Sequence, residues 1–153
     1  MNFLVFFLYI IPCFFTSGVS AEKISKTYSF VDFDKLRIGH TFEIRVEKGE
    51  EYKISITGEE KYFENIDVGT NNHELVIDYE WEFFVFGNES ERVLIEITMP
   101  SLKKVQFGGA SKSLITGFDE ENMEIEISGA SESTISLDTE KLFLEVEGAS
   151  KTT

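Results

Sequence analysis

The sequence predicts an all-β protein built as a single-stranded, right-handed parallel β-helix (β-solenoid), with a more irregular β-rich N-terminal part. Three observations predict this fold. Apolar and polar residues alternate in six segments, no segment shows a convincing helical period, and a Gly-Ala-Ser motif recurs at regular spacing near the C-terminus. The six segments are residues 42–46, 52–56, 75–79, 93–99, 123–127 and 142–146.

The alternation in these segments is typical of strands with one buried and one solvated face. In the first segment Phe42, Ile44 and Val46 alternate with charged residues, and the other five segments repeat the pattern. Successive side chains of a strand point to opposite faces, so the apolar set of each segment lies on one side. We therefore expect strands at all six places.

The repeat is the most specific feature of the sequence. Gly109-Ala110-Ser111, Gly129-Ala130-Ser131 and Gly148-Ala149-Ser150 follow one another at spacings of 20 and then 19 residues. A repeat of this length without a helical pattern fits one turn of a solenoid made of short strands. When the motifs are superposed, these residues align: Val105, Ile125 and Leu144; Phe107, Ile127 and Val146; Ile115 and Ile135; Ser113, Ser133 and Thr152.

Stacked turns explain the residue types of the motif. Glycine permits a sharp bend where each turn passes directly above the one below, and serine can bond backbone groups that the ladder leaves unpaired. The next residues, Lys112, Glu132 and Lys151, should form a column of alternating charge. Glu126 should lie beside Glu145, where the two like charges repel each other.

The segment Met99-Pro100-Ser101-Leu102-Lys103-Lys104-Val105, followed by the Gly-Ala-Ser units, resembles the putative auto-transporter adhesin head GIN domain family. The resemblance implies a β-solenoid fold, export from the cytoplasm and an adhesin-like role. Two features depart from the family pattern. Gly108 stands where the family usually has serine, and the chain stops at Thr153, where family members generally continue. We therefore expect a domain truncated at its C-terminal end, and the alternative is that another copy stacks on the open turn.

The N-terminus reads as an export signal. Residues 3–15 are almost entirely apolar, no charged residue precedes Glu22, and small residues come just before it. The apolar run is shorter than the roughly 20 residues of a membrane-spanning helix. Residues 1–21 are therefore predicted to be a signal peptide and residues 22–153 a single β-solenoid domain without a transmembrane span. The absence of Lys or Arg at the start leaves an uncleaved membrane anchor as the alternative.

Charge and chemistry exclude several classes of function. The net charge of −14 opposes binding to nucleic acid, and the single cysteine lies in the predicted signal. His40 and His73 have no metal-ligand or triad spacing, and they read as residues of turns or strand ends. We interpret the serines of the motif as structural rather than as nucleophiles; they are Ser111, Ser131 and Ser150. The sequence thus predicts no catalytic residue, no metal ion and no cofactor.

An aromatic run is the candidate ligand site. Tyr79, Trp81 and Phe83 alternate with glutamates, which suits either a half-buried strand or a platform on which a sugar stacks. The other candidate is an outer face carrying Glu126 and Glu145, since polysaccharide lyases and hydrolases use paired carboxylates.

We therefore expect an exported, non-enzymatic domain of the cell envelope or the secreted fraction, with an adhesin-like or structural surface-binding role. The alternative is a polysaccharide lyase or hydrolase on the same scaffold. The expected partners are a cell-surface carbohydrate or a second copy. The expected location is the periplasm, the outer cell surface or the medium.

Overall fold

The structure, a computed structural model, describes residues 22–80 and 92–153, which confirm the all-β prediction. The predicted signal peptide, Trp81 and Phe83 lie outside the described residues. The described residues contain one short 3-10 turn, Glu60–Tyr62, and no α-helix. The strands are β1 (Lys23–Tyr28), β2 (Lys35–Ile38), β3 (Phe42–Lys48), β4 (Lys53–Glu59), β5 (Ile66–Asn71), β6 (Glu74–Tyr79), β7 (Val93–Met99), β8 (Lys104–Phe107), β9 (Lys112–Ile127), β10 (Glu132–Val146) and β11 (Lys151–Thr152).

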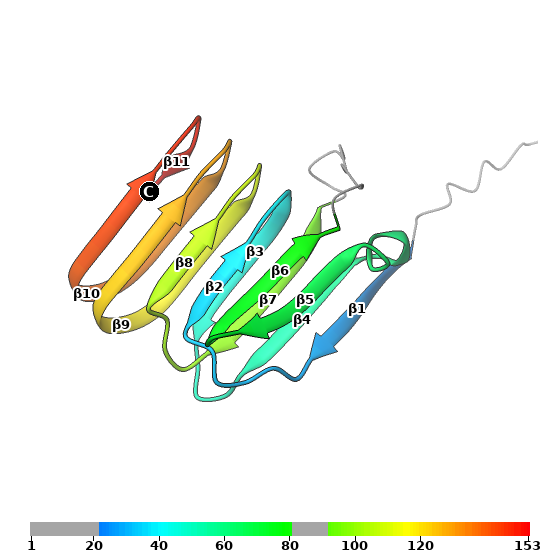
Figure 1. Ribbon diagram of the computed structural model, residues 1–153, viewed down its shortest axis with the longest axis horizontal. Coiled ribbons are helices and arrows are strands. Elements are labelled where there is room, and N and C mark those ends of the chain that lie inside the picture. Colours follow the sequence, from blue (N-terminus) through cyan, green and yellow to red (C-terminus); the bar gives the residue numbers. More distant parts are fainter. Residues whose placement is uncertain (1–21, 81–91) are drawn as a thin grey trace, which may run out of the picture.

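All the strands belong to one curled, mixed sheet, whose order is β1-β4-β7-β3-β9-β8-β2-β6-β5, with β10 between β9 and β11. The long strand β9 pairs with β3 through residues 112–116 and with β8 through residues 124–127. Between these halves the chain turns at Gly117, whose φ is +82°. The sheet thus folds back on itself, and its strands form two layers joined by turns (Figure 1).

We call these layers the first and the second wall. The first wall contains β5, β6, β2, β8 and the C-terminal halves of β9 and β10; the second contains β1, β4, β7, β3, the N-terminal halves of β9 and β10, and β11. Alternate side chains of both walls point inward into one hydrophobic core. The most deeply buried include Leu36, Ile44, Ile95, Val105 and Ile125, each 0% exposed.

The predicted alignment of the repeats is confirmed. Val105 pairs with Ile125 and Phe107 with Ile127, and Ile125 and Ile127 pair in turn with Leu144 and Val146. Ile115 lies beside Ile135, and Ser113, Ser133 and Thr152 form one row. Glu132 lies between Lys112 and Lys151, so the predicted charge column has the expected register.

The motif glycines form one corner of the curled sheet. Gly109, Gly129 and Gly148 have φ values of +82°, +88° and +77°, which l-amino acids with side chains rarely adopt. A Cβ on Gly129 would lie 2.2 Å from the carbonyl oxygen of Gly109, one repeat below. His40 occupies the same corner in the neighbouring strand pair, with φ +62°. The predicted role of glycine is therefore confirmed.

The motif serines bond backbone carbonyl groups at this corner. The Ser131 hydroxyl lies 3.0 Å from the Ser128 carbonyl oxygen, and the Ser150 hydroxyl lies 3.0 Å from that of Glu147. Ser131 is 2% exposed and its oxygen also lies 3.2 Å from that of Ser111. These serines therefore satisfy polar groups inside the corner, as the sequence predicted.

A right-handed parallel β-helix over the whole of residues 22–153 is not what the sheet shows. The pairs β1–β4, β4–β7 and β5–β6 are antiparallel, so the sheet is mixed. Between β5 and β6, Asn72 and His73 both have positive φ (50° and 61°), as in the tight turn that closes an antiparallel hairpin. The antiparallel strands coincide with the N-terminal part that the sequence marked as more irregular.

Three apolar residues on the inward side of β10, namely Leu142, Leu144 and Val146, are 40–45% exposed. They are exposed because no described strand lies beyond that half of β10.

Among the described residues, no helix has the length and hydrophobicity needed to span a bilayer.

Candidate ligand-binding furrow

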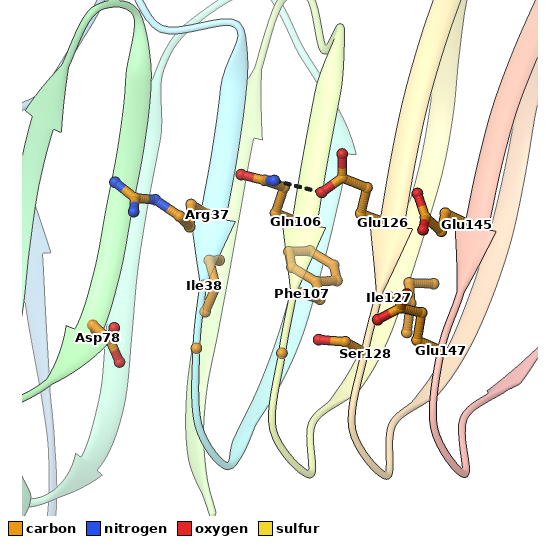
Figure 2. Close-up of a pocket in the computed structure, with 12 residues that line it drawn as sticks. Arg37, Ile38, Asp78, Gln106, Phe107, Glu126, Ile127, Ser128, Glu145 and Glu147 are labelled. Carbon is orange, nitrogen blue, oxygen red and sulfur yellow. Dashed lines mark hydrogen bonds between the residues drawn. The ribbon is translucent and has the colours of Figure 1, made fainter.

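A furrow with a volume of about 440 Å³ runs across the outer face of the first wall. Its rim is formed by outward side chains of β2, β8, β9 and β10 (Figure 2). Gly39 and Gly108 come directly after β2 and β8, in the row that Ser128 and Glu147 continue after β9 and β10 with side chains. The missing side chains leave the groove open at that point. The polar lining residues are Arg37, Asp78, Gln106, Glu126, Ser128, Glu145 and Glu147.

The two glutamates singled out in the sequence both line this furrow. Glu126 and Glu145 are partners in the parallel pairing of β9 and β10, which confirms their predicted neighbourhood. Figure 2 shows their side chains next to one another on the outer face. Glu147 comes directly after the end of β10 and also lines the furrow.

Glu126 is held in its charged form by two donors. Gln106 donates a short hydrogen bond to Oε2, and Lys104 Nζ lies 2.8 Å from Oε1. These interactions lower the pKa of Glu126 from 4.5 to about 2, and the hydrogen bond from Gln106 has the largest effect. Because the pKa is lowered in the folded state, ionised Glu126 contributes to the stability of the folded protein. This contribution is complete above pH 4.5 and is lost as pH falls towards 2.

Replacing Gln106 by alanine should raise the pKa of Glu126, because the largest cause of its lowering is removed. The upward shift should be about 1 unit, measured by NMR titration of the side-chain carboxyl carbon. Thr134→Ala, on the second wall, is the matched control and should leave the titration unchanged. An unchanged pKa in Gln106→Ala would show that this amide does not hold the carboxylate.

The opposite end of the furrow is fixed by contacts between neighbouring strands. Arg37 Nε lies 3.2 Å from Glu74 Oε2. Asp78 Oδ1 accepts the Tyr79 backbone N–H at 2.9 Å and forms a short contact with His40 Nδ1. Carboxylate, amide, hydroxyl and guanidinium groups thus share one open groove, which suits a ligand rich in hydroxyl groups.

Residues 32–153 match the family model described as "Putative auto-transporter adhesin, head GIN domain". The chain belongs to this family. The resemblance stated from the sequence is therefore confirmed, and the family is described by adhesion rather than by an enzymatic activity. Membership implies a cell-surface or exported protein.

Solved structures described as putative adhesins share the fold of this family member. One from Bacteroides fragilis has a TM-score of 0.77 at 21% identity, and one from Parabacteroides merdae has a TM-score of 0.71 at 15% identity. The matches cover 87% and 83% of this chain, but only 62% and 53% of those proteins. A putative lipid binding protein from Parabacteroides distasonis is also similar, with a TM-score of 0.64 at 16% identity over 83% of this chain and 63% of its own. No curated protein matches the sequence.

The aromatic run, for which the sequence left both a half-buried strand and a sugar platform open, is described only at Tyr79 in this family member. Tyr79 is 6% exposed, and its ring stacks on Phe42 with 4.8 Å between centroids. His40 meets the ring edge-on at 5.6 Å. Tyr79 thus packs in the core, and Trp81 and Phe83 lie outside the described residues.

The two histidines and the possible metal ligands can also be compared with the sequence predictions. His40 and His73 both occupy turns, as expected, and His73 Nδ1 lies 2.7 Å from the Asp32 carbonyl oxygen. In residues 22–80 and 92–153, no three His, Cys, Asp or Glu side chains are placed to hold a metal ion.

Sequence reasoning missed most of the furrow. Arg37 and Asp78 come from strands far from the repeats in sequence, and their approach depends on β2 lying between β6 and β8. The one available signal was Gly108, where the family usually has serine. That departure removes a side chain from the middle of the groove.

Proposed function

We propose that this protein is an exported, non-enzymatic domain with an adhesin-like role, which binds a cell-surface carbohydrate in the furrow of the first wall. The observation that carries the proposal is the set of hydrogen-bonding groups around an open groove. Carboxylates accept bonds from sugar hydroxyl groups, whereas Arg37 and Gln106 donate them. An open groove accommodates a chain of sugars passing through it.

The furrow is built on a rigid frame. Arg37, Gln106, Glu126 and Glu145 each project from a strand whose register is fixed by its neighbours. Glu126 is bonded before any ligand arrives. Groups held in place in this way lose little conformational entropy on binding, which favours recognition by a domain exposed at a surface.

The state of Glu126 argues against this residue as the general acid of a glycoside hydrolase. Such an enzyme needs one carboxyl group whose pKa is raised, so that it can protonate the leaving oxygen. The pKa of Glu126 is lowered to about 2, and the group is therefore ionised at neutral pH. It can accept hydrogen bonds from a sugar but cannot act as the general acid.

We also propose that the protein is exported and that its repeats form a β-helix. Residues 1–21 would be removed as a signal peptide, in keeping with the exported character of the family. The turns formed by residues 104–152 would be successive turns of a right-handed parallel β-helix, because their pairing is parallel with offsets of 19 and 20 residues. Such a frame repeats the same outer face from turn to turn.

Filling the furrow should strongly weaken carbohydrate binding without unfolding the protein. Gly108→Tyr suits this test because a Cβ at this residue meets only Ser128 Oγ, at an ordinary 3.5 Å. The measurement is affinity electrophoresis of the purified protein through gels that contain soluble polysaccharides. We expect at least about a tenfold loss of affinity for any polysaccharide that retards the wild type, equivalent to about 1.4 kcal/mol.

The matched control is Gly69→Tyr on β5, where an added Cβ meets no atom within 4 Å and no furrow residue is replaced. It should bind like the wild type. If Gly108→Tyr, with a native circular dichroism spectrum, is retarded as strongly as the wild type by the same polysaccharide, the furrow is not the binding site.

A further inference from the structure

The C-terminal half of β10 is a free edge of the first wall, and neither the proposed function nor the family description accounts for it. This half pairs with β9 on one side, whereas β11 pairs with β10 only at Glu132 and Ser133, in its other half. In the described part of the chain, no strand lies beyond residues 142–146. Their inward side chains are 40–45% exposed, and the outward Phe143 is 58% exposed.

The backbone of this edge is open as well. The Glu147 N–H donates a hydrogen bond to the Ile127 carbonyl oxygen of β9 at 2.8 Å. Successive residues of a strand direct their backbone groups to alternate sides, so those of Leu142, Leu144 and Val146 are directed away from β9. Such an edge is a template on which a further strand can pair.

The opposite end of the sheet, where β1 and β5 lie, is closed. The 3-10 turn Glu60–Tyr62 lies at that end (Figure 1). Tyr62 and Phe63 belong to the core and are 3% and 8% exposed, and Lys26 of β1 lies 4.7 Å from the centre of the Phe63 ring. A head-to-tail stack of copies would thus place an open apolar edge against a closed end. The same open edge of another molecule is the better match.

We infer that the β10 edge pairs with the β10 edge of a second copy, antiparallel and about a two-fold axis at Leu144. The two Leu144 side chains then face each other, and Leu142 faces Val146 of the second copy. Lys141 faces Glu147 of the second copy, so opposite charges lie directly across the interface on both sides of the axis. A two-fold axis makes the contact closed, and the product is a dimer.

Other registers of the same edge match less well. An axis at Phe143 would place Val146 opposite the charged Glu140, and an axis at Glu145 would place Lys141 opposite Ala149. Axes that lie between residues would pair inward side chains with outward ones. The register centred on Leu144 also brings the two exposed Phe143 rings into diagonal positions, which lie within reach of aromatic side chains.

The charges at the edge support pairing, although the whole molecule is acidic. Within the described part of the chain, neither Lys141 nor Glu147 has an ion-pair partner of its own, so both are available to a second copy. The net charge of −14 on each copy opposes association, but at physiological ionic strength charges further apart than about 8 Å are largely screened.

The dimer would join two furrows on one face. A two-fold axis perpendicular to the first wall keeps both outer faces on the same side, and Glu145 and Glu147 of each furrow lie next to the axis. This consequence rests on the proposed function, whereas the dimer itself does not depend on what the furrow binds.

Sedimentation velocity of the purified protein tests the inference, at concentrations from about 1 to about 100 µM, the range in which weak interfaces associate. We expect the wild type to become a dimer within this range. Leu144→Lys should weaken the dimer at least about tenfold, because it places two like charges at the axis. The residue is 43% exposed, so the fold should tolerate the change. The matched control is Leu114→Lys, at an outward residue that is 39% exposed on the second wall, and it should dimerise like the wild type.

Charge reversal tests the register and does not depend on Leu144. Lys141→Glu and Glu147→Lys each place like charges across the axis, so each variant alone should dimerise about tenfold more weakly. An equimolar mixture of the two restores opposite charges at both positions and should form a mixed dimer as strong as that of the wild type.

A wild type that stays monomeric at about 100 µM would overturn the inference. So would oligomers that keep growing with concentration, which would indicate head-to-tail stacking, or equal effects of Leu144→Lys and Leu114→Lys. A mixture of the two charge variants that associates no better than either one alone would refute the register. None of these results depends on glycan binding, so they are separate from the test of the furrow.

Discussion

Gly129→Ala is expected to destabilise the protein by about 3 kcal/mol. The residue has φ +88°, which costs a residue with a side chain about 1–2 kcal/mol. Its new Cβ would also lie 2.2 Å from the Gly109 carbonyl oxygen, so the backbone of two stacked turns must separate. Displacing packed structure adds about 1–3 kcal/mol. Urea denaturation followed by far-UV circular dichroism measures the change.

The control for this prediction is Gly69→Ala. Nothing lies within 4 Å of a Cβ at Gly69, and the residue is in a strand without positive φ. Its stability should change by less than about 1 kcal/mol, and an increase is expected if it changes at all. Equal denaturation midpoints for the two variants would show that the corner glycines do not constrain the stack.

Ile127→Asp should lower stability by more than about 4 kcal/mol at neutral pH. Ile127 is 1% exposed and lies between Phe107 and Val146 in the inward row of the first wall. A charged carboxylate there loses its hydration and gains no partner. We expect the loss of a cooperative thermal transition, or a melting temperature lowered by at least about 10 °C.

The cause of this effect can be checked with pH. A buried carboxyl group has a raised pKa in the folded state, so protonation removes part of the penalty and the variant should recover stability near pH 4.5. Leu114→Asp is the control, because Leu114 points outward from β9 and is 39% exposed. It should cost less than about 1 kcal/mol. Similar melting of both variants would contradict the inward assignment.

Much of the local structure could be predicted because it follows from short-range rules. Strand positions came from the two-residue period, since one face of each strand meets the core. The register of the repeats came from the motif, because a left-handed corner residue must recur wherever the chain turns in the same way. The same reasoning placed Glu126 beside Glu145. The role of Gly129 could be predicted because glycine readily adopts a positive φ, and that of Ser131 because its hydroxyl group can bond nearby backbone groups.

The sheet order and the candidate site could not be predicted in the same way. Alternating strands can pair in either direction, and the antiparallel hairpin depends on two residues, Asn72 and His73, whose left-handed conformation the sequence does not mark strongly. The sheet order also places β6 beside β2, which comes earlier in the chain, and so brings Asp78 to Gly39. Such non-local pairing leaves no periodic signal. Tyr79 illustrates the ambiguity, because an aromatic residue at period two fits both a core and a ligand platform.

The central claim is that the furrow binds a glycan and leaves it intact. The most direct measurement reads each spot of a glycan array twice, by fluorescence for bound protein and by mass spectrometry for the glycan. We expect that glycans which bind the wild type keep their mass, and that those bound through the furrow no longer bind Gly108→Tyr, although they still bind Gly69→Tyr. Shortened glycans on the wild-type spots, or equal binding by wild type and Gly108→Tyr to every glycan, would contradict it.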